Sequence, residues 1–308
     1  MQNWTKADIP PQAGRLAVIT GGTSGLGYQT ALALARAGAD VILTGSKDAE
    51  GREALARIRP SAPAALVRFE WLDLASLDSV AHFADRLSTS GRAIDLLINN
   101  AGVTALPRRQ VTPDGFEMQF AANYLGHFAL TARLLPLLAA SRQPRVVQVS
   151  SLAHRFGRID FDDLNGERRY RPWAAYCQSK LAVLLFALEL QKRSTAHRWG
   201  VQSNSVHPGY AQTGPIANGG GGRSPLPLLS KTLGGVIGHS PEAGALPTLY
   251  AATEHRVKPG GFYGPQGPFE LAGPPGEAQI ADKARDAAVA QRLWAESERL
   301  TGVRWLAW

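Results

Sequence analysis

Tyr176 and Lys180 lie four residues apart in the stretch YCQSK, and their side chains are of the types that acid–base catalysis uses. The leucines that follow recur at helical spacing, at Leu181, Leu184, Leu185 and Leu188. This spacing predicts a helix with one buried face over residues 173–193. Side chains four residues apart leave the same face of a helix, so Tyr176 and Lys180 could both contact one small molecule.

A free tyrosine has a pKa near 10 and exchanges protons poorly at neutral pH, whereas a neighbouring cation favours its phenolate form. At about 4 Å and an effective dielectric constant of roughly 20, Lys180 would attract this phenolate by about 4 kcal/mol, which predicts a lowered pKa for Tyr176. The same pattern also fits an ordinary amphipathic helix that carries a surface tyrosine and a solvated lysine. The other motifs of the chain decide between these two interpretations.

The chain has 308 residues, of which 44% are hydrophobic and 19% are charged, a composition typical of a globular protein. Apolar runs such as residues 181–188 are too short to cross a bilayer, and the N-terminus lacks a basic start followed by an apolar segment. These features predict a soluble, cytoplasmic protein without an integral membrane segment.

The single cysteine, Cys177, excludes an intrachain disulfide and a cysteine-based metal cluster, and no metal site is predicted. Its place beside Tyr176 fits a small packed side chain, with a reactive thiol as the alternative. The net charge of +8 comes from 33 basic residues scattered along the chain, without an aromatic-interleaved patch. We therefore expect no nucleic-acid partner, and a basic surface that attracts a polyanionic cofactor accounts for the charge.

A glycine-rich loop follows the first predicted strand, residues 16–19. The loop reads TGGTSGLG over residues 20–27, and an alanine- and leucine-rich helix follows over residues 28–37. Glycines let the backbone approach a pyrophosphate, and the free N–H groups at a helix start bind it. The spacing is GxxxGxG rather than the GxGxxG fingerprint. The unit predicts a dinucleotide-binding loop, with a plain turn as the alternative.

The second predicted strand, residues 40–44, ends where an acidic residue would bind the ribose 2′-hydroxyl of NAD, about twenty residues after the glycines. Ser46 and Lys47 stand there instead, and a hydroxyl with a cation suits a 2′-phosphate. NADP is therefore predicted over NAD, which stays possible. The alternative is that Lys47 only faces water.

Strands and helices continue to alternate along the chain. Further strands are predicted over residues 65–71, 94–98, 145–149, 201–206 and up to 261–264, and helices over 76–87, 112–140, 241–252 and 278–301. The alternation predicts an α/β fold, a single-domain, Rossmann-like, doubly wound parallel β-sheet with helices on both faces. Ligands then bind beyond the carboxyl ends of the strands, where the polar residues are Thr20, Ser46, Asp73, Asn99 and Ser150.

Six motifs occur in an order that resembles the short-chain dehydrogenase/reductase family. They are TGGTSGLG at residues 20–27, NNAG at 99–102, NYLGHF from Asn123, VSS ending at Ser151, YCQSK at 176–180 and HPG at 207–209. The resemblance covers residues 14–264. The stretches SSLAHRFGRIDFDDLNG and AYCQSKLAVLLF look most like the retinol-dehydrogenase-like branch and its bacterial relatives.

The resemblance implies a catalytic tetrad of Asn123, Ser151, Tyr176 and Lys180. In reduction, Tyr176 would donate a proton to the carbonyl oxygen while the nicotinamide delivers hydride to the carbon, and Ser151 would hydrogen-bond that oxygen. Lys180 would lower the pKa of Tyr176 and bind the nicotinamide ribose. Asn123 would hold a water that links Lys180 to solvent.

The resemblance also implies which residues bind the cofactor. They are Gly21, Thr23, Ser24, Gly25, Leu26 and Gly27 at the pyrophosphate, Ser46 and Lys47 at the 2′-phosphate, Asp73 and Leu74 at the adenine, Asn100, Ala101 and Gly102 behind the ribose, Tyr176 and Lys180 at the nicotinamide ribose, and Pro208, Gly209 and Thr213 at the nicotinamide. Relatives in this branch commonly have Arg where Ser46 stands. The NADP prediction therefore depends mainly on Lys47 and on the missing acid.

These features predict one domain over residues 1–308, with an N-terminal arm (1–13), a core that carries the cofactor and catalytic residues (14–207), a substrate lid (210–240) and a C-terminal extension (265–308). The predicted function is hydride transfer between NADP(H) and the carbonyl or alcohol of a hydrophobic small molecule, such as a retinal-like or steroid-like compound or an aryl ketone. Two alternatives stay open: a C=C (ene) reductase on the same fold, and a non-catalytic NADP(H)-sensing binding protein. The family often forms dimers or tetramers, which makes a homo-oligomer possible.

Overall fold

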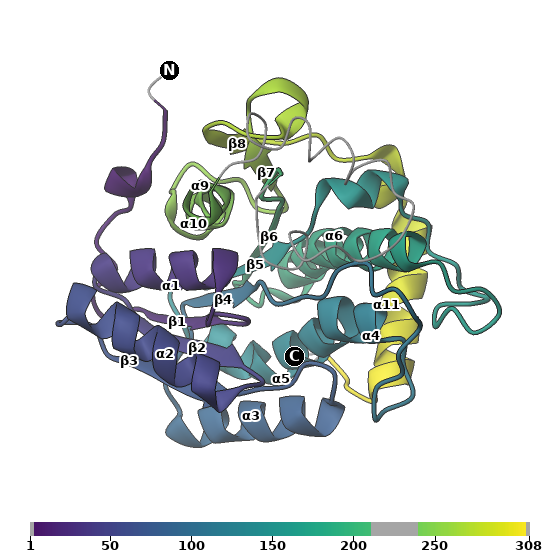
Figure 1. Cartoon of the computed structure of the whole chain (residues 1–308), viewed down its shortest axis with the longest axis horizontal. Helices are drawn as coiled ribbons and strands as arrows, with labels where there is room; N and C mark the ends of the chain where they lie inside the picture. Colours follow the sequence, from purple (N-terminus) through teal and green to yellow (C-terminus); the bar gives the residue numbers. More distant parts are fainter. Residues whose placement is uncertain (1–2, 211–239, 306–308) are drawn as a thin grey trace.

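An eight-stranded sheet forms the centre of the computed structural model, which describes residues 3–210 and 240–305 (Figure 1). The strand order is β3-β2-β1-β4-β5-β6-β7-β8, and all neighbours are parallel except β7 and β8. The strands are β1 Leu16–Ile19, β2 Asp40–Gly45, β3 Val67–Trp71, β4 Leu96–Asn99, β5 Arg145–Val149, β6 Gln202–Val206, β7 Phe262–Pro265 and β8 Pro275–Glu277. This order confirms the predicted doubly wound α/β fold.

The chain reverses its direction of winding at β1. It first adds β2 and β3 on one side, and then adds β4, β5, β6 and β7 on the other. Ile19 at the end of β1 pairs with Leu43 of β2 and with Ile98 of β4, so the loops after these strands emerge side by side. In open α/β sheets this switch point is where ligands bind.

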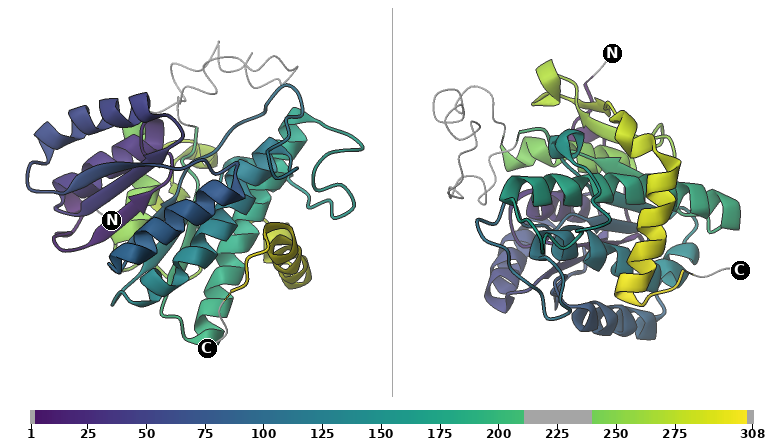
Figure 2. Two further views of the ribbon diagram at one scale, coloured as in Figure 1. Left: turned by 90° about the horizontal axis from the view of Figure 1, so that it is seen from below. Right: turned by 90° about the vertical axis from the view of Figure 1, so that its right-hand side faces the viewer.

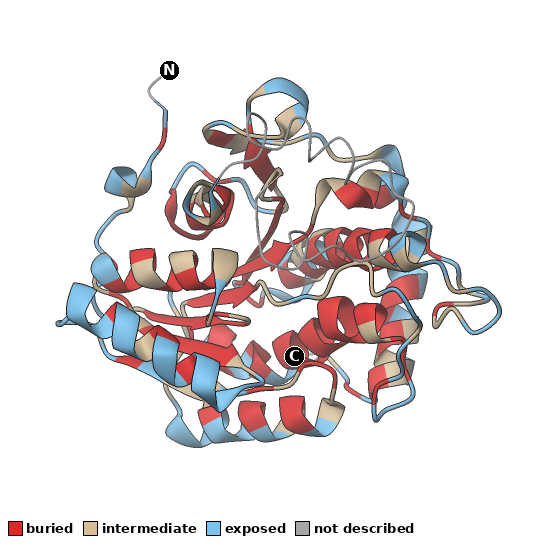
Figure 3. Ribbon diagram, in the orientation of Figure 1, coloured by how far each residue is buried: buried red, intermediate tan, exposed pale blue. Residues whose placement is uncertain are grey.

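Helices cover both faces of the sheet and create two hydrophobic cores (Figure 2). One face carries α1 Gly25–Arg36, α2 Asp48–Ile58, α9 Pro241–Gly244 and α10 Leu246–Thr253, and the other carries α3 Leu77–Ser90, α5 Gly126–Ala139, α6 Pro172–His197 and α11 Ala287–Thr301. Neighbouring strand residues such as Val18 and Ile19 enter opposite cores, because successive side chains of a strand point to opposite faces. Figure 3 shows the central strands and α5 and α6 buried, whereas the edge strands β3 and β8 are buried only in part and the outer faces of α2 and α3 are exposed.

Short helical turns connect these elements. They are η1 Lys6–Asp8, η2 Arg59–Ser61, α4 Met118–Phe120, the π-helical turn η3 Ala121–Leu125, η4 Leu152–Phe156, η5 Pro268–Glu270 and η6 Asp282–Arg285. Several helix ends follow sequence signals: the Ser76 side chain accepts the Ser79 N–H at the start of α3, and Gly91, with φ 61°, ends that helix. A side-chain acceptor and a left-handed glycine are the typical caps of a helix.

Several element predictions need correction. The helix α2 and the antiparallel strand β8 were not expected. Residues 112–117 are not helical, because the helical segment begins at Met118, and the last helix begins at Ala287 instead of residue 278. Trp305, after the last helix, packs on the body, with its ring 4.5 Å from that of Trp294. Thr213 and most of the predicted lid, residues 211–239, lie outside the described residues.

Helix α6 differs from the expected amphipathic helix. It is buried on nearly its whole circumference from Cys177 to Leu190, because β5 and β6, η4 and α11 all pack against it. By length and composition this helix could cross a membrane, which corrects the expectation that every apolar segment is too short. Since 78% of its most apolar window is buried inside the protein, α6 is a central core helix.

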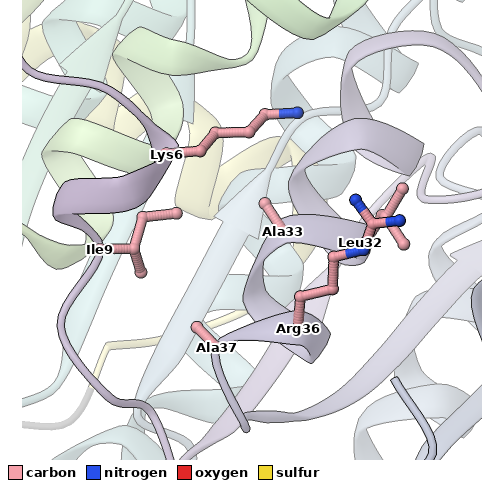
Figure 4. A pocket seen from close by; sticks show the side chains of 6 residues that line it. All are labelled: Lys6, Ile9, Leu32, Ala33, Arg36 and Ala37. Atoms are coloured by element: carbon pink, nitrogen blue, oxygen red, sulfur yellow. The ribbon is translucent and has the colours of Figure 1, made fainter. Parts of the chain in front are cut away.

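A surface depression of about 280 Å³ lies between the N-terminal arm and the C-terminal half of α1 (Figure 4). Its walls include Lys6 and Ile9 from the arm and Leu32 and Arg36 from the helix. The Lys6 ammonium already pairs with Glu242 at 2.7 Å. The depression lies at the end of α1 remote from the glycine loop, so it takes no part in the predicted site.

Candidate active site

The predicted site residues gather at the carboxyl edge of the sheet. Thr20 follows β1, Asn99 ends β4 and Ser150 follows β5, and these three strands are neighbours. Ser46 and Asp73 follow β2 and β3, the next two strands on the other side of β1. The parallel sheet therefore brings five separate chain segments to one edge, as the strand ends predicted.

The glycine loop turns tightly above β1. Gly21 and Gly25 adopt φ angles of 61° and 54°, which residues with side chains rarely adopt. A Cβ on Gly22 would lie 2.6 Å from the Leu43 Cβ, and a Cβ on Gly27 would collide with the Gly21 carbonyl oxygen. Helix α1 begins at Gly25, and the Ser24 side chain does not cap it. The partly exposed loop thus presents the free N–H groups of a helix start, a cradle that fits a dinucleotide pyrophosphate.

Thr20 connects the glycine loop by hydrogen bonds to the loop that follows β4. Its hydroxyl oxygen accepts the N–H groups of Asn100 at 2.9 Å and of Ala101 at 3.0 Å. The Asn100 amide in turn donates to the Thr20 carbonyl at 2.9 Å. These bonds hold the segment predicted to lie behind the ribose in contact with the glycine loop.

The predicted 2′-phosphate site is open to solvent. Ser46 and Lys47 are exposed, and the Lys47 ammonium lies 2.8 Å from the Glu50 carboxylate, which raises the pKa of Lys47. The Asp73 carboxylate accepts the Ala75 N–H at 2.9 Å, and Leu74 is buried against α5. An exposed ion pair is weak, so a phosphate could compete with Glu50 for Lys47.

Asn123 lies in the π-helical turn and is almost fully buried. Its side-chain oxygen accepts the Val103 N–H at 2.7 Å, and its amide donates to the Val103 carbonyl at 3.0 Å and to the Ser179 hydroxyl at 2.9 Å. Asn123 therefore joins the segment after β4 to helix α6. A π turn displaces a residue from regular helix geometry, and such turns are frequent at functional sites.

Lys180 reaches the same place from α6. Its ammonium donates to the Val149 carbonyl at 3.0 Å and lies 5.9 Å from the centre of the Tyr176 ring. A Cβ on Gly102 would lie 2.9 Å from the Asn123 side-chain oxygen and 3.5 Å from the Lys180 nitrogen. Gly102 thus leaves the space in which these two side chains meet.

Tyr176 as a whole residue is partly exposed, but its hydroxyl is buried beside the side chains of Ser151 and Thr104. Burial raises the pKa of this hydroxyl above its ordinary value, and the two hydrogen-bonding side chains oppose the rise. The expected lowering of the pKa by Lys180 is therefore wrong for this structure: desolvation dominates, and it also lowers the pKa of Lys180 to about 8.

Two residues near the tetrad were missed in the sequence. Thr104 contacts the Tyr176 hydroxyl and precedes Ala105, whose φ of 46° is unusual for a residue with a side chain. His127 lies 2.8 Å from the Thr20 hydroxyl through Nε2, and its Nδ1 donates to the Asn123 carbonyl at 2.9 Å. Their places directly after NNAG and inside NYLGHF were the available signals.

Replacement of Thr104 by valine should raise the pKa of Tyr176, since the hydroxyl that opposes the effect of burial is lost. Alcohol oxidation needs Tyr176 deprotonated, so the rising limb of kcat/KM against pH should move to higher pH. The same exchange at exposed Thr195, at the far end of α6, should leave the profile unchanged. A profile of T104V that stays in place, or moves to lower pH, would show that Thr104 does not act on Tyr176.

The remaining predicted residues lie after β6. Pro208 and Gly209 are partly exposed at the carboxyl end of this strand, and Gly209 has a φ of 71°.

Cys177 is buried, and burial raises the pKa of its thiol to about 12, which supports the packed interpretation over the reactive one. Within residues 3–210 and 240–305, no three His, Cys, Asp or Glu side chains are placed to hold a metal ion.

Comparison with known proteins agrees with this arrangement. The family model described as short chain dehydrogenase matches residues 15–218. The chain belongs to the short-chain dehydrogenase family. Members of this family are oxidoreductases that bind NAD(P) and act on small molecules.

Relatives of this short-chain dehydrogenase place it in the retinol-dehydrogenase-like branch. It is 44% identical to human retinol dehydrogenase 13 over 305 residues, which covers 97% of this chain and 87% of that protein. It is 42% identical to polyprenol dehydrogenase of Mus musculus over 299 residues, covering 96% and 86%. The crystal structure of an uncharacterised protein from Mycobacterium paratuberculosis matches with a TM-score of 0.83 and 42% identity, over 99% of this chain and 100% of that one.

Proposed function

We propose that this short-chain dehydrogenase transfers hydride between NADP(H) and the carbonyl or alcohol of a hydrophobic substrate. The observation that carries the proposal is the meeting of Tyr176, Ser151, Asn123 and Lys180 at the sheet edge, directly beside the glycine loop. A non-catalytic binding protein would have no need for a tyrosine hydroxyl placed beside the hydroxyl side chains of Ser151 and Thr104.

The chain's own residues would handle the proton. When bound, the nicotinamide supplies the hydride to the carbonyl carbon, or accepts it from the alcohol. In reduction, Tyr176 donates its proton to the carbonyl oxygen, and its raised pKa keeps that proton in place at neutral pH. Ser151 directs its hydroxyl at the same oxygen, where negative charge develops. Lys180, anchored on the Val149 carbonyl, supplies positive charge beside Tyr176.

The NADP preference is supported by the residues after β2. No carboxylate stands at Ser46 or Lys47 to repel a 2′-phosphate, and Glu50 binds Lys47 only through an exposed pair. Replacement of Lys47 by alanine should therefore weaken NADPH binding about tenfold and leave NADH binding nearly unchanged. Titration of reduced-nicotinamide fluorescence measures both. Lys192→Ala, an exposed lysine of α6, is the control, and equal effects of K47A on both cofactors would contradict the assignment.

A hydrophobic substrate is supported by two exposed aromatic side chains on the segments that carry Ser151 and Tyr176. Phe156, five residues after Ser151, is exposed, and the ring of half-exposed Trp173 lies 5.6 Å from that of Tyr176. Exposed aromatic rings offer contact area to a lipophilic ligand. The relatives named for retinol and polyprenol suggest the same class of substrate.

A direct assay tests the proposal. NADPH and NADH are incubated in parallel with retinal, steroid ketones, aryl ketones and short aldehydes, and the absorbance of the reduced nicotinamide is followed. We expect consumption of NADPH with a bulky carbonyl and recovery of the alcohol. A product reduced at C=C would favour an ene reductase, and tight cofactor binding without turnover across the panel would favour a binding protein.

A further inference from the structure

Glu270 lies in the C-terminal extension, yet its carboxylate joins two loops of the active site. Its Oε2 accepts hydrogen bonds from Nη2 of Arg155, at 2.5 Å, and from Nε2 of His207, at 3.1 Å. Its Oε1 accepts a hydrogen bond from the Gln279 N–H at 2.9 Å. Arg155 belongs to η4, which follows Ser151, and His207 directly precedes Pro208 and Gly209. Hydrogen bonds to an ionised carboxylate are among the strongest in proteins.

The direction of the bond between His207 and Glu270 follows from the neighbours of the ring. Nδ1 of His207 accepts the Gly209 N–H at 3.2 Å, so the proton of the neutral ring lies on Nε2 and points to Glu270. The His207 side chain is 0% exposed, and its ring packs 5.2 Å from that of Phe262. A Cβ on Gly264 would collide with Nε2 of His207, so this glycine provides the space for the ring.

The backbone makes a second connection between the same segments. The Tyr210 N–H donates to the Leu271 carbonyl at 2.8 Å, and a Cβ on Gly209 would collide with that carbonyl oxygen. Phe269 and Glu270 adopt left-handed φ angles of 55° and 58°. Side-chain residues keep such a conformation only where their surroundings enforce it, and it is found mainly at functional sites.

We propose that Glu270 is a positioning residue that holds residues 207–210 against the loop that carries Ser151. It thereby fixes the wall on which the nicotinamide end of the dinucleotide rests. The inference builds on the proposed function, because it assumes that a nicotinamide dinucleotide binds at this edge. It gives the C-terminal extension a role in orienting the cofactor, which no sequence motif of that extension indicates.

The test compares full-length variants at Glu270. Glu270→Ala removes all three acceptor contacts, whereas Glu270→Gln keeps an oxygen for His207 but loses the charge that binds Arg155. We expect the dissociation constant of NADPH to rise about tenfold in E270A and less in E270Q. Adenosine 2′,5′-bisphosphate, which lacks the nicotinamide half, should bind both variants as it binds the unchanged protein. The control is Glu277→Ala, whose carboxylate pairs with Lys258 on the surface at 2.6 Å.

The outcomes separate this inference from the proposed function. If E270A binds NADPH as tightly as the unchanged protein, or if NADPH and the bisphosphate weaken equally, Glu270 has only a structural role and the inference is wrong. A fall in melting temperature with unchanged affinity leads to the same conclusion. If the unchanged protein binds neither NADPH nor NADH, the proposed function fails first, and the role of Glu270 fails with it.

Discussion

Replacement of Tyr176 by phenylalanine should reduce turnover by a factor of about 10²–10⁴ and leave cofactor affinity nearly unchanged. Phenylalanine removes only the hydroxyl that meets Ser151 and Thr104. The ring stays available for its contacts with Trp173, at 5.6 Å, and with the Lys180 ammonium, at 5.9 Å. The proton donor is lost while the fold of α6 is kept.

Initial rates with NADPH and a carbonyl substrate, together with fluorescence titration of NADPH, measure both parts of this prediction. Tyr263→Phe is the matched control, since its hydroxyl accepts the Lys258 N–H at the amino end of β7, away from the site. This control should lower stability slightly and keep turnover. If Y176F retains turnover within about threefold, Tyr176 is not the proton donor, because general acid–base catalysis contributes at least about a hundredfold.

Replacement of Gly27 by alanine should weaken dinucleotide binding by about 10- to 100-fold. The added Cβ would collide with the Gly21 carbonyl oxygen and lie 2.5 Å from the Asn100 amide nitrogen. Neither neighbouring group can move freely. The Gly21 carbonyl belongs to a backbone segment in the left-handed conformation, and the Asn100 side-chain amide donates a hydrogen bond to the Thr20 carbonyl. Overpacking of this kind costs about 1–3 kcal/mol, and opening the loop to relieve it would distort the pyrophosphate cradle.

Gly91→Ala is the control for this change. Gly91 ends α3 with a φ of 61°, and a Cβ there would meet no atom within 4 Å. Its substitution should lower the free energy of unfolding by about 1 kcal/mol through backbone strain and leave cofactor binding intact. Binding of NADPH by G27A at the affinity of the unchanged protein would show that the close approach of α1 to the loop is not needed for the cofactor.

The sequence predicted most strands because their residues carry the information locally. The strand Leu16–Ile19 is a fully buried apolar run, and Arg145–Val149 was predicted with its observed bounds. Helix α2 was missed because it follows the strand β2 without a strong apolar period, and β8 because three residues, Pro-Gly-Glu, carry no strand pattern. Short elements that depend on a neighbouring strand cannot be identified from their own residues.

The residues of the candidate site were likewise predicted only in part. Its motifs could be read because each has a fixed local spacing, and the parallel sheet then brings Asn123, Ser151, Tyr176 and Lys180 together. Thr104 was missed although it closely follows NNAG, and Glu270 could not be identified, since it belongs to no local pattern with chemical meaning. Glu270 reaches His207 across 63 residues of sequence, a distance over which spacing has no predictive value.

By itself, the sequence determined the class of fold, the edge of the sheet at which ligands gather, and the residue types that could transfer a proton. These properties follow from hydrophobic period, glycine placement and motif order, which are local. Only the tertiary structure decided the direction of the pKa shifts in the site and which distant residues, such as Glu270, contact its loops. It buries Tyr176 and Lys180 enough to raise the pKa of the first and lower that of the second. Desolvation depends on everything packed around a group, so no spacing along the chain could have given its direction.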